Sequence, residues 1–354
     1  MKRQLALAVA LITMITALFA SFPASAAFSD VPDDYSYKRA ITTLSKLNVI
    51  NGYENNTFEP EKNITRAEFT KIIVYMLGYD SFTDKITQFD DVSADHWANA
   101  NIKTAYDLGI INGFDEKTFK PDDPVTYEQA LKMIVCTLGY QSLAEQKGGY
   151  PVGYQTQAAS LGLTDGITGI TYTDNASRGV IAQAMYNALE VNMLDPLATE
   201  SGTQKNLLND YLHVYILKGT VVGVESSTTN ECTVTLNPGQ IDIKDALGDE
   251  YVMDYTEYTD SYADMNAMLG QTVEAYYRAD SNSTDRWLIE IDNETYSNSE
   301  ITVNSYNIDS YSNGSLSYYA TDDAGRATNT RINTSEATIR YNGRAVSGNV
   351  TIGD

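Results

Sequence analysis

The pattern best suited to chemistry in this sequence is an arginine at the start of a predicted helix. Arg66 follows Thr65, a good helix-capping residue, and Glu68 stands three positions after that cap, which completes a capping box. Free N–H groups at a helix start favour negative charge, and a guanidinium can hold a carboxylate by two parallel hydrogen bonds. The segment can therefore bind an anion, although an ordinary surface arginine beside an acidic residue has the same pattern.

Patterns that would indicate catalysis are missing from the sequence. It contains two histidines, His96 and His213, and two cysteines, Cys136 and Cys232. We find no nucleophile elbow, phosphate-binding loop, zinc-protease motif or Cys-x-x-Cys pair. The acidic loop at residues 115–118 lacks the ligand spacing of a calcium site. We therefore expect a protein that is not an enzyme and that holds no metal or cofactor.

The charge balance limits the partners that the chain can bind. Its 354 residues include 24 Lys and Arg against 47 Asp and Glu, so the formal net charge is −23. This charge repels nucleic acid and anionic membrane surfaces. An anionic polymer could be held only by a few local cationic groups.

The elements that position these groups follow from internal repeats. Segments that begin at Phe28 and Phe89 share, at a constant offset of 61, the patterns Phe-x-Asp-Val, Ile-Asn-Gly-aromatic, Thr-Phe-x-Pro and Leu-Gly-Tyr. A more divergent third copy follows, in which residues 158–163 match residues 105–110 at an offset of 53. A period of this length indicates an array of structural repeats.

Each copy has the apolar period of two helices joined by a loop. Ala40, Ile41, Leu44 and Leu47 form one face of a first helix, which we expect to end in a turn at Gly52, where glycine would supply a positive φ. A second helix is expected to start after Thr65. Because helix pairs this short cannot bury their apolar faces alone, the three copies should pack as one unit.

These motifs resemble the S-layer homology (SLH) repeat of bacterial surface proteins. The resemblance rests on Phe28–Val31, Ile50–Tyr53, Thr57–Pro60 and Ile64–Glu68, with residues 89–140 similar to a second repeat. It covers roughly residues 28 to 194. It implies three repeats that bind a secondary cell-wall polysaccharide, attached to peptidoglycan and typically carrying pyruvate ketals.

The resemblance also implies which residues bind. The family's binding motif is Thr-Arg-Ala-Glu at the start of the second helix, and the first copy keeps it with Thr65, Arg66 and Glu68. The third copy keeps the arginine, as Ser177 and Arg178, but has no glutamate. We expect both arginines to contact the polysaccharide.

Two aromatic residues are further candidates. The second copy has Tyr127 in place of the arginine, so its groove is either silent or stacks a sugar on Tyr127. Trp97 stands where the family commonly has an aromatic residue entering the first helix. We expect core packing for Trp97, with sugar stacking as the alternative.

Paired glycines and aspartates complete the candidates. Gly52 and Gly113 are expected to serve the backbone geometry first, and they can also let a ligand approach the main chain. Asp30 and Asp91 are expected to cap the first helices, although the family's grooves also use acidic residues near this point.

The two ends of the chain differ from the repeats. Residues 1–26 have the positive start, apolar run and small residues of a signal peptide. After a linker at residues 195–211, residues 212–354 contain strand-like runs at 214–224 and 233–236, and a hairpin signal at 272–291. A short helix is expected within residues 254–269. This β-rich region is expected to form up to two small modules and to be incomplete.

The sequence therefore predicts an α+β multidomain chain. Residues 1–26 are the signal peptide, residues 28–80, 89–141 and 148–194 form an all-α array of three SLH-like repeats, and a β-rich region follows. The expected protein is secreted, needs no membrane after signal cleavage, is anchored to the cell wall, and either projects its β-rich region or self-associates in a surface layer. The alternative is the N-terminal anchor of an exoenzyme or adhesin that acts on extracellular polysaccharide.

Overall fold

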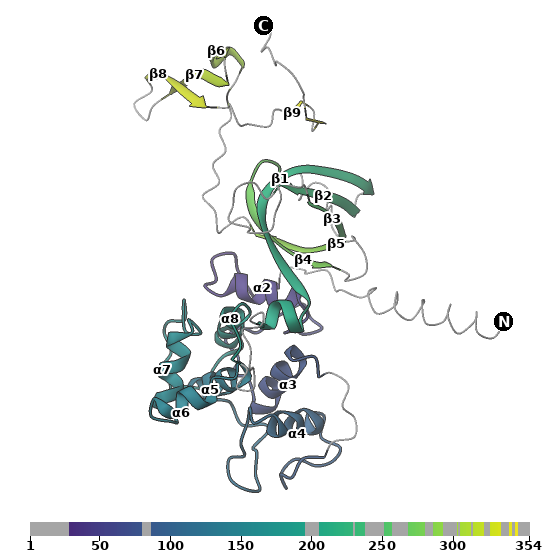
Figure 1. The fold of residues 1–354 in the computed structure, drawn as a ribbon, viewed down its shortest axis with the longest axis vertical. Helices are drawn as coiled ribbons and strands as arrows, with labels where there is room; N and C mark the ends of the chain where they lie inside the picture. The colour runs from purple at the N-terminus through teal and green to yellow at the C-terminus, as the bar shows by residue number, and fades with distance from the viewer. Residues whose placement is uncertain are drawn as a thin grey trace, which may run out of the picture. The chain divides into compact units, whose positions relative to one another are not determined.

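The computed structural model describes residues 28–79, 86–194, 205–228, 231–237, 251–256, 268–279, 286–292, 303, 305–312, 314–321, 326–333, 340–341 and 344–345. The expected signal peptide lies outside this part of the chain. The chain separates into two units, Met1–Tyr215 and Ile216–Asp354. Helices fill the first unit and strands follow from Val214 onward, which confirms the α+β class (Figure 1).

The helices of the first unit fall into pairs. They are α2 (Lys38–Lys46), α3 (Arg66–Met76), α4 (Asn99–Asp107), α5 (Tyr127–Thr137), α6 (Gln141–Gln146), α7 (Val152–Ser160) and α8 (Arg178–Ala188). We number the copies expected from the sequence in chain order, as residues 28–80, 89–141 and 148–194. Their helix pairs are α2 with α3, α4 with α5, and α7 with α8, and α6 is an additional helix that the sequence did not predict. Among the described residues, no helix is both long and apolar enough to cross a bilayer.

The helix pairs pack on one another in a cycle. The second helix of each copy contacts the first helix of another copy: α3 packs on α4, α5 on α7, and α8 on α2 (Figure 1). The predicted apolar face of α2 is buried at Ala40, Ile41, Leu44 and Leu47. The copies therefore share one core.

Main-chain hydrogen bonds at the starts of the second helices close the same cycle. Ile64 N donates to Ala176 O (3.1 Å), Ala176 N donates to Val125 O (2.9 Å), and Val125 N donates to Ile64 O (3.0 Å). The three residues directly precede the capping residues Thr65, Thr126 and Ser177 in their own copies. This ring brings the starts of α3, α5 and α8 together.

The first helices end in left-handed residues, as expected, but at other positions than predicted. The positive φ angles are at Asn48 (61°), Gly109 (72°) and Gly162 (73°), whereas Gly52 is not in this conformation. The prediction of a positive φ at Gly52 is therefore wrong. Asparagine tolerates the left-handed conformation, so the helix can end before the glycine is reached.

The segment before the first strand is partly packed on the helical unit. A π-helical turn, η1 (Leu207–Tyr211), lies within the expected linker of residues 195–211. Leu207 and Leu208 are buried, and Leu208 N donates to Leu189 O (2.9 Å). The described end of this linker is therefore part of the helical unit.

The second unit contains a closed barrel of five strands. These are β1 (Val214–Thr228), β2 (Glu231–Asn237), β3 (Tyr251–Thr256), β4 (Thr272–Ala279) and β5 (Arg286–Asp292), in the order β1-β2-β3-β5-β4. β4 and β5 are antiparallel, with Ala275 opposite Ile291, which confirms the predicted hairpin. The strand predictions at 214–224 and 233–236 are confirmed by β1 and β2. β3 takes up residues 254–256 of the expected helix, and residues 257–267 lie outside the described part.

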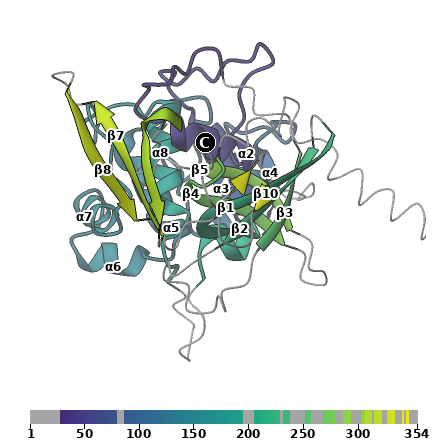
Figure 2. The same cartoon turned by 90° about the horizontal axis from the view of Figure 1, so that it is seen from above.

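The strands that follow form smaller sheets. After a short 3-10 turn, η2 (Ser305–Asn307), come β6 (Ile308–Ser312), β7 (Ser315–Thr321) and β8 (Ala327–Asn333), which form an antiparallel sheet with β7 in the middle. β7 and β8 lie side by side in Figure 2. β9 (Arg340–Tyr341) pairs with β10 (Arg344–Ala345).

Candidate functional site

The start of α3 has the capping geometry that the sequence predicted. Thr65 Oγ1 accepts a hydrogen bond from Glu68 N (3.2 Å), and Glu68 Oε2 accepts one from Thr65 N (2.8 Å). Both side chains are occupied in capping the helix. The polar side chain of this segment that extends away from the cap is Arg66.

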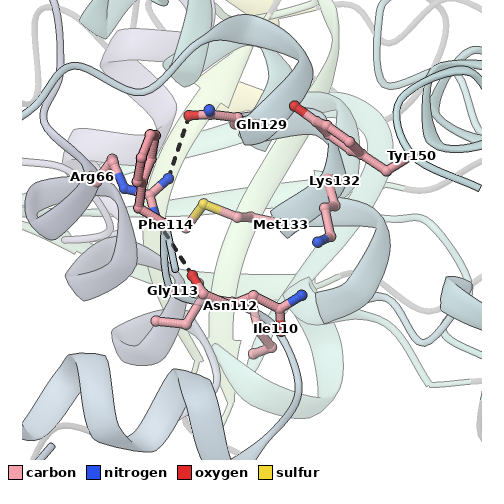
Figure 3. Close-up of a pocket in the computed structure, with 10 residues that line it drawn as sticks. Arg66, Ile110, Asn112, Gly113, Phe114, Gln129, Lys132, Met133 and Tyr150 are labelled. Carbon is pink, nitrogen blue, oxygen red and sulfur yellow. Dashed lines mark hydrogen bonds between the residues drawn. The ribbon is translucent and has the colours of Figure 1, made fainter. Parts of the chain in front are cut away.

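Arg66 belongs to the first copy, but its side chain contacts the second copy. Its Nε donates to Phe119 O (2.8 Å), and its two Nη atoms donate to Gln129 Oε1 (3.3 Å) and Asn112 O (3.4 Å). The guanidinium carbon lies 4.5 Å from the centroid of the Phe119 ring. Figure 3 shows the guanidinium between Gln129 and Asn112. We call this meeting of two copies the Arg66 junction.

A cavity of about 270 Å³ opens at the Arg66 junction. Lys132 supplies a second cation, and Phe114 and Tyr150 are aromatic residues that are 61% and 46% exposed. The side chains converge from the first, second and third copies (Figure 3). The remaining lining residues are Ile110, Ile111, Asn112, Gly113, Gln129 and Met133. We call this cavity the Arg66 pocket.

The cations of the Arg66 pocket have no acidic partner in the described part of the chain, where neither Arg66 nor Lys132 forms a salt bridge. Arg66 is thus not an ordinary surface arginine paired with an acidic residue, which was the alternative that the sequence allowed. Burial lowers the pKa of Arg66 below its usual value, and the charges of Asp123 and Asp91 oppose this. Arginine stays protonated despite such shifts. The pocket therefore offers positive charge beside exposed aromatic rings.

Tyr150 is held at the pocket by its hydroxyl, which donates to Glu128 Oε1 (3.0 Å). Burial and this hydrogen bond raise the pKa of Tyr150 to about 12. Lys132 Nζ lies 5.5 Å from the centroid of the Tyr150 ring, within range of a cation–π contact. An aromatic ring and an ammonium group are thus presented together on one wall.

The Arg178 junction repeats this arrangement between the third and first copies. Arg178 Nε donates to Phe58 O (2.9 Å) and its Nη2 donates to Asn51 O (2.7 Å), which are the counterparts of Phe119 and Asn112 at the offset of 61. Lys71 corresponds to Lys132, and its Nζ lies 5.7 Å from the Trp97 ring centroid. Arg178 is only 6% exposed, so this junction is more closed around its arginine.

The Tyr127 junction, between the second and third copies, has lost these cations. Tyr127 is 4% exposed and stacks on Tyr172, with ring centroids 5.8 Å apart and planes 8° from parallel. Five positions after the capping-motif arginine or tyrosine, α8 has Gln183 where α3 and α5 have lysines. Tyr172 covers one face of the Tyr127 ring, and the two alternatives for this groove, silent or stacking a sugar on Tyr127, stay predictions.

The two aspartates act on a loop instead of a helix start. Asp91 accepts hydrogen bonds from Phe119 N (2.9 Å) and Lys120 N (2.7 Å), and Asp30 accepts the equivalent pair from Phe58 N (2.8 Å) and Glu59 N (2.7 Å). The prediction that they cap the first helices is wrong: the residues before α2 and α4 are Tyr37 and Ala98, without side-chain capping bonds. The reason is that each aspartate binds a loop that begins 28 residues later in the chain, which folding brings next to it.

Glycine is required at positions 52 and 113 because other atoms lie too close to leave room for a side chain. A Cβ atom on Gly113 would lie 2.1 Å from Asp115 O, and one on Gly52 would lie 2.2 Å from the Phe28 ring. Gly113 lines the Arg66 pocket, so its main chain is accessible to a ligand there. Neither glycine has the positive φ that favours glycine, so close approach, and not backbone conformation, is the structural reason for both. Ligand contact stays a prediction.

The exposure of Trp97 contradicts a further prediction. It is 54% exposed and stacks on His96, with centroids 5.5 Å apart, so core packing is wrong. The core position is the next residue, Ala98, which is buried like its counterpart Tyr37 in the first copy. Trp97 is therefore exposed beside Lys71, as Tyr150 is beside Lys132 in the Arg66 pocket.

Sequence reasoning missed the residues that complete the Arg66 pocket, namely Asn112, Phe114, Gln129, Lys132 and Tyr150. Two signals were present. Lys71 and Lys132 are related by the offset of 61, and Trp97 and Tyr150 by the offset of 53. These repeated lysine and aromatic positions do not predict a site by themselves. The residues of one site come from neighbouring copies, and the sequence does not show how the copies pack.

Comparison with known proteins identifies the first two copies. Residues 27–70 and 88–131 match the S-layer homology domain. The chain is 26% identical to a cell surface protein of Thermoanaerobacter kivui over 325 residues, which are 84% of this chain and 41% of the relative. It is 31% identical to the middle cell wall protein of Brevibacillus brevis over 196 residues, 54% of this chain and 18% of the relative.

An enzyme is also similar: an amylopullulanase of Thermoanaerobacterium thermosulfurigenes is 29% identical over 187 residues, 49% of this chain and 10% of the relative. The chain thus spans less than half the length of each of these relatives. It contains S-layer homology domains in its first two copies. It is a protein of the bacterial cell wall or cell surface.

Proposed function

We propose that the helical unit anchors this chain to the cell wall by binding an anionic secondary cell-wall polysaccharide in the Arg66 pocket. The protein is then a secreted, non-enzymatic surface or S-layer protein. Residues 1–26 direct its export, and the β-rich region projects from the wall or self-associates. The polymer that fits best carries carboxylates, such as pyruvate ketals.

The observation that carries this proposal is the composition of the Arg66 pocket. Arg66 and Lys132 supply charge-assisted donors for a carboxylate, and the exposed rings of Phe114 and Tyr150 supply faces on which sugar rings can stack. A chain of net charge −23 can hold an anionic polymer only through such local cations.

We propose further that residues 148–194 are a third repeat and that the Arg178 junction is a second binding site. The cyclic hydrogen bonds between Ile64, Val125 and Ala176 support the third repeat, because they give all three copies the same main-chain contact. The recurrence of arginine, lysine and exposed aromatic in Arg178, Lys71 and Trp97 supports the second site. Thr65, Ser177 and Glu68 serve these sites by capping the helices that carry the arginines.

The proposal is tested by Lys132→Gln in the mature chain, assayed by sedimentation with cell walls purified from the producing bacterium. Glutamine keeps most of the side chain and removes the charge, as at Gln183. We expect binding to weaken about 5-fold, since one partly solvated charge contact contributes on the order of 1 kcal/mol. Lys103→Gln is the control, because it removes an equal charge from α4, where Lys103 pairs with Asp107. Equal binding by both variants and the parent would contradict the proposal.

A second candidate function is suggested by the amylopullulanase relative: the chain would be the anchor of an enzyme that acts on extracellular polysaccharide. The helical unit would bind the wall in either case. Assays of the mature chain for hydrolysis of starch, xylan and cellulose distinguish the two, and activity on any of them would favour this second candidate.

A further inference from the structure

One peptide group connects a carboxylate to the arginine at the Arg66 junction. The peptide between Phe119 and Lys120 donates its N–H to Asp91 Oδ2 (2.7 Å) and accepts Arg66 Nε on its C=O (2.8 Å). The carboxylate and the guanidinium therefore lie at opposite ends of the same peptide dipole, in the orientation that both charges favour. Hydrogen bonds in such a chain polarise and strengthen one another.

Asp91 also fixes the conformation of that peptide. Its other oxygen accepts Phe119 N (2.9 Å), so two successive N–H groups are held by one side chain. Lys120 has a φ of 58°, a conformation that residues other than glycine rarely adopt. The two bonds keep the Phe119 carbonyl and ring in place beneath the Arg66 guanidinium.

The same connection is built a second time at the Arg178 junction. The peptide between Phe58 and Glu59 donates to Asp30 Oδ2 (2.7 Å) and accepts Arg178 Nε (2.9 Å). Glu59 has a φ of 57°, matching Lys120. Asp30 and Asp91 thus serve arginines of different copies through equivalent loops.

The third copy provides an internal comparison. Its loop peptide at Thr171 donates instead to Asp174 within the same loop (2.8 Å). The side chain that reaches this loop is Tyr127, which carries no charge. At the Tyr127 junction, whose residues all lie within the described segment 86–194, the long-range aspartate and the arginine are therefore absent together, which indicates that they act together.

We propose that Asp91 and Asp30 are positioning residues that hold Arg66 and Arg178, through one loop peptide each, in the orientation that binds ligand. The inference rests on the proposed function of the arginines. At the Arg66 junction the Nε bond is short, whereas the Nη bonds to Gln129 and Asn112 are 3.3 and 3.4 Å long. The Arg66 Nε group stays fixed to the loop, and the Arg66 Nη groups exchange these weak contacts for a ligand carboxylate.

The test is a double-mutant cycle in the mature chain, with binding to purified cell walls as the measurement. Asp91→Asn keeps the size of the side chain and removes its charge, and we expect binding to weaken about 10-fold. In an Arg66→Ala background, Asp91→Asn should have no further effect. In a Lys71→Gln background, which changes the other junction, its full effect should remain. Equal effects in both backgrounds would overturn the inference, because loss of structure alone acts regardless of the partner.

A second measurement does not depend on wall binding. The Arg66 Nε–H resonance should be protected from solvent exchange in the parent and lose protection in Asp91→Asn, but not in Asp30→Asn. Unchanged protection in Asp91→Asn would overturn the inference. If protection is lost as expected but Arg66→Ala binds walls normally, the positioning role stands and the proposed function fails. If Asp91→Asn is not folded at the assay temperature, Asp91→Glu, which displaces the carboxylate by one methylene, takes its place in both measurements.

Discussion

The Arg66 and Tyr127 junctions have the same main-chain geometry and different side chains. Arg66 N donates to Asp123 O (3.0 Å) and Ala67 N to Pro121 O (3.0 Å); at the other junction, Tyr127 N donates to Asp174 O and Glu128 N to Tyr172 O, both at 2.9 Å. At the Arg66 junction two cations surround a cavity, whereas at the Tyr127 junction two tyrosines stack. The repeat architecture is therefore maintained by the main chain, and the side chains are free to acquire or lose a binding role.

The largest expected effect is the loss of stability when the glycine at each junction is replaced by alanine. In Gly113→Ala the new Cβ would lie 2.1 Å from a backbone oxygen, so the loop of the Arg66 pocket must shift, at a cost of about 3 kcal/mol of unfolding free energy. Gly166, its counterpart at the offset of 53, has a φ of 73° but no atom closer than 4.0 Å to the new Cβ. Gly166→Ala should therefore cost only about 1 to 2 kcal/mol, from backbone conformation. Urea denaturation of both variants measures the difference, and equal losses would contradict the overlap at Gly113.

The next largest effect concerns the arginine. Arg66→Ala removes charge-assisted donors from the pocket, and we expect wall binding to fall about 10-fold or more. Arg66→Lys keeps the charge but lacks the planar fork, so an intermediate loss is expected if a carboxylate is held by two bonds. Thermal melts must accompany the assay, since Arg66→Ala also leaves Phe119 O without its donor. Wild-type binding by a folded Arg66→Ala chain would remove the functional difference between the junctions.

These comparisons also show what the sequence could and could not predict. The helix pairs and the Thr65 to Glu68 capping box follow from local periodicity and short-range hydrogen bonds, and they were predicted. The pocket was not, because Arg66, Lys132 and Tyr150 come from three copies and meet only through cyclic packing. Asp91 was misread for the same reason, since its partners lie in a loop 28 residues later.

Exposure was equally hard to predict where neighbours in sequence alternate between core and surface. Trp97 stands where the family commonly has an aromatic residue entering the first helix, which predicts core packing, but Ala98 occupies the core position. In the β-rich region, alternation over single strands predicted the β4–β5 hairpin. Closure of the barrel depends on the parallel neighbours β3 and β5, whose pairing is not encoded in either strand alone.

The smallest expected effect is at the tyrosine hydroxyl of the Tyr127 junction. Tyr127 Oη is buried and has no hydrogen-bond partner among the described residues, and burial raises the pKa of this hydroxyl above its usual value. A buried polar atom without a partner destabilises the folded state, so Tyr127→Phe should raise the unfolding free energy by up to about 1 kcal/mol. Wall binding should stay unchanged, because the ring still stacks on Tyr172 and no ligand contact is lost. Tyr172→Phe is the matched control, since that ring is 39% exposed and its hydroxyl can bind water. A clear loss of wall binding in Tyr127→Phe would mean that the hydroxyl meets the polymer, and that the Tyr127 junction is a third binding site instead of a structural contact.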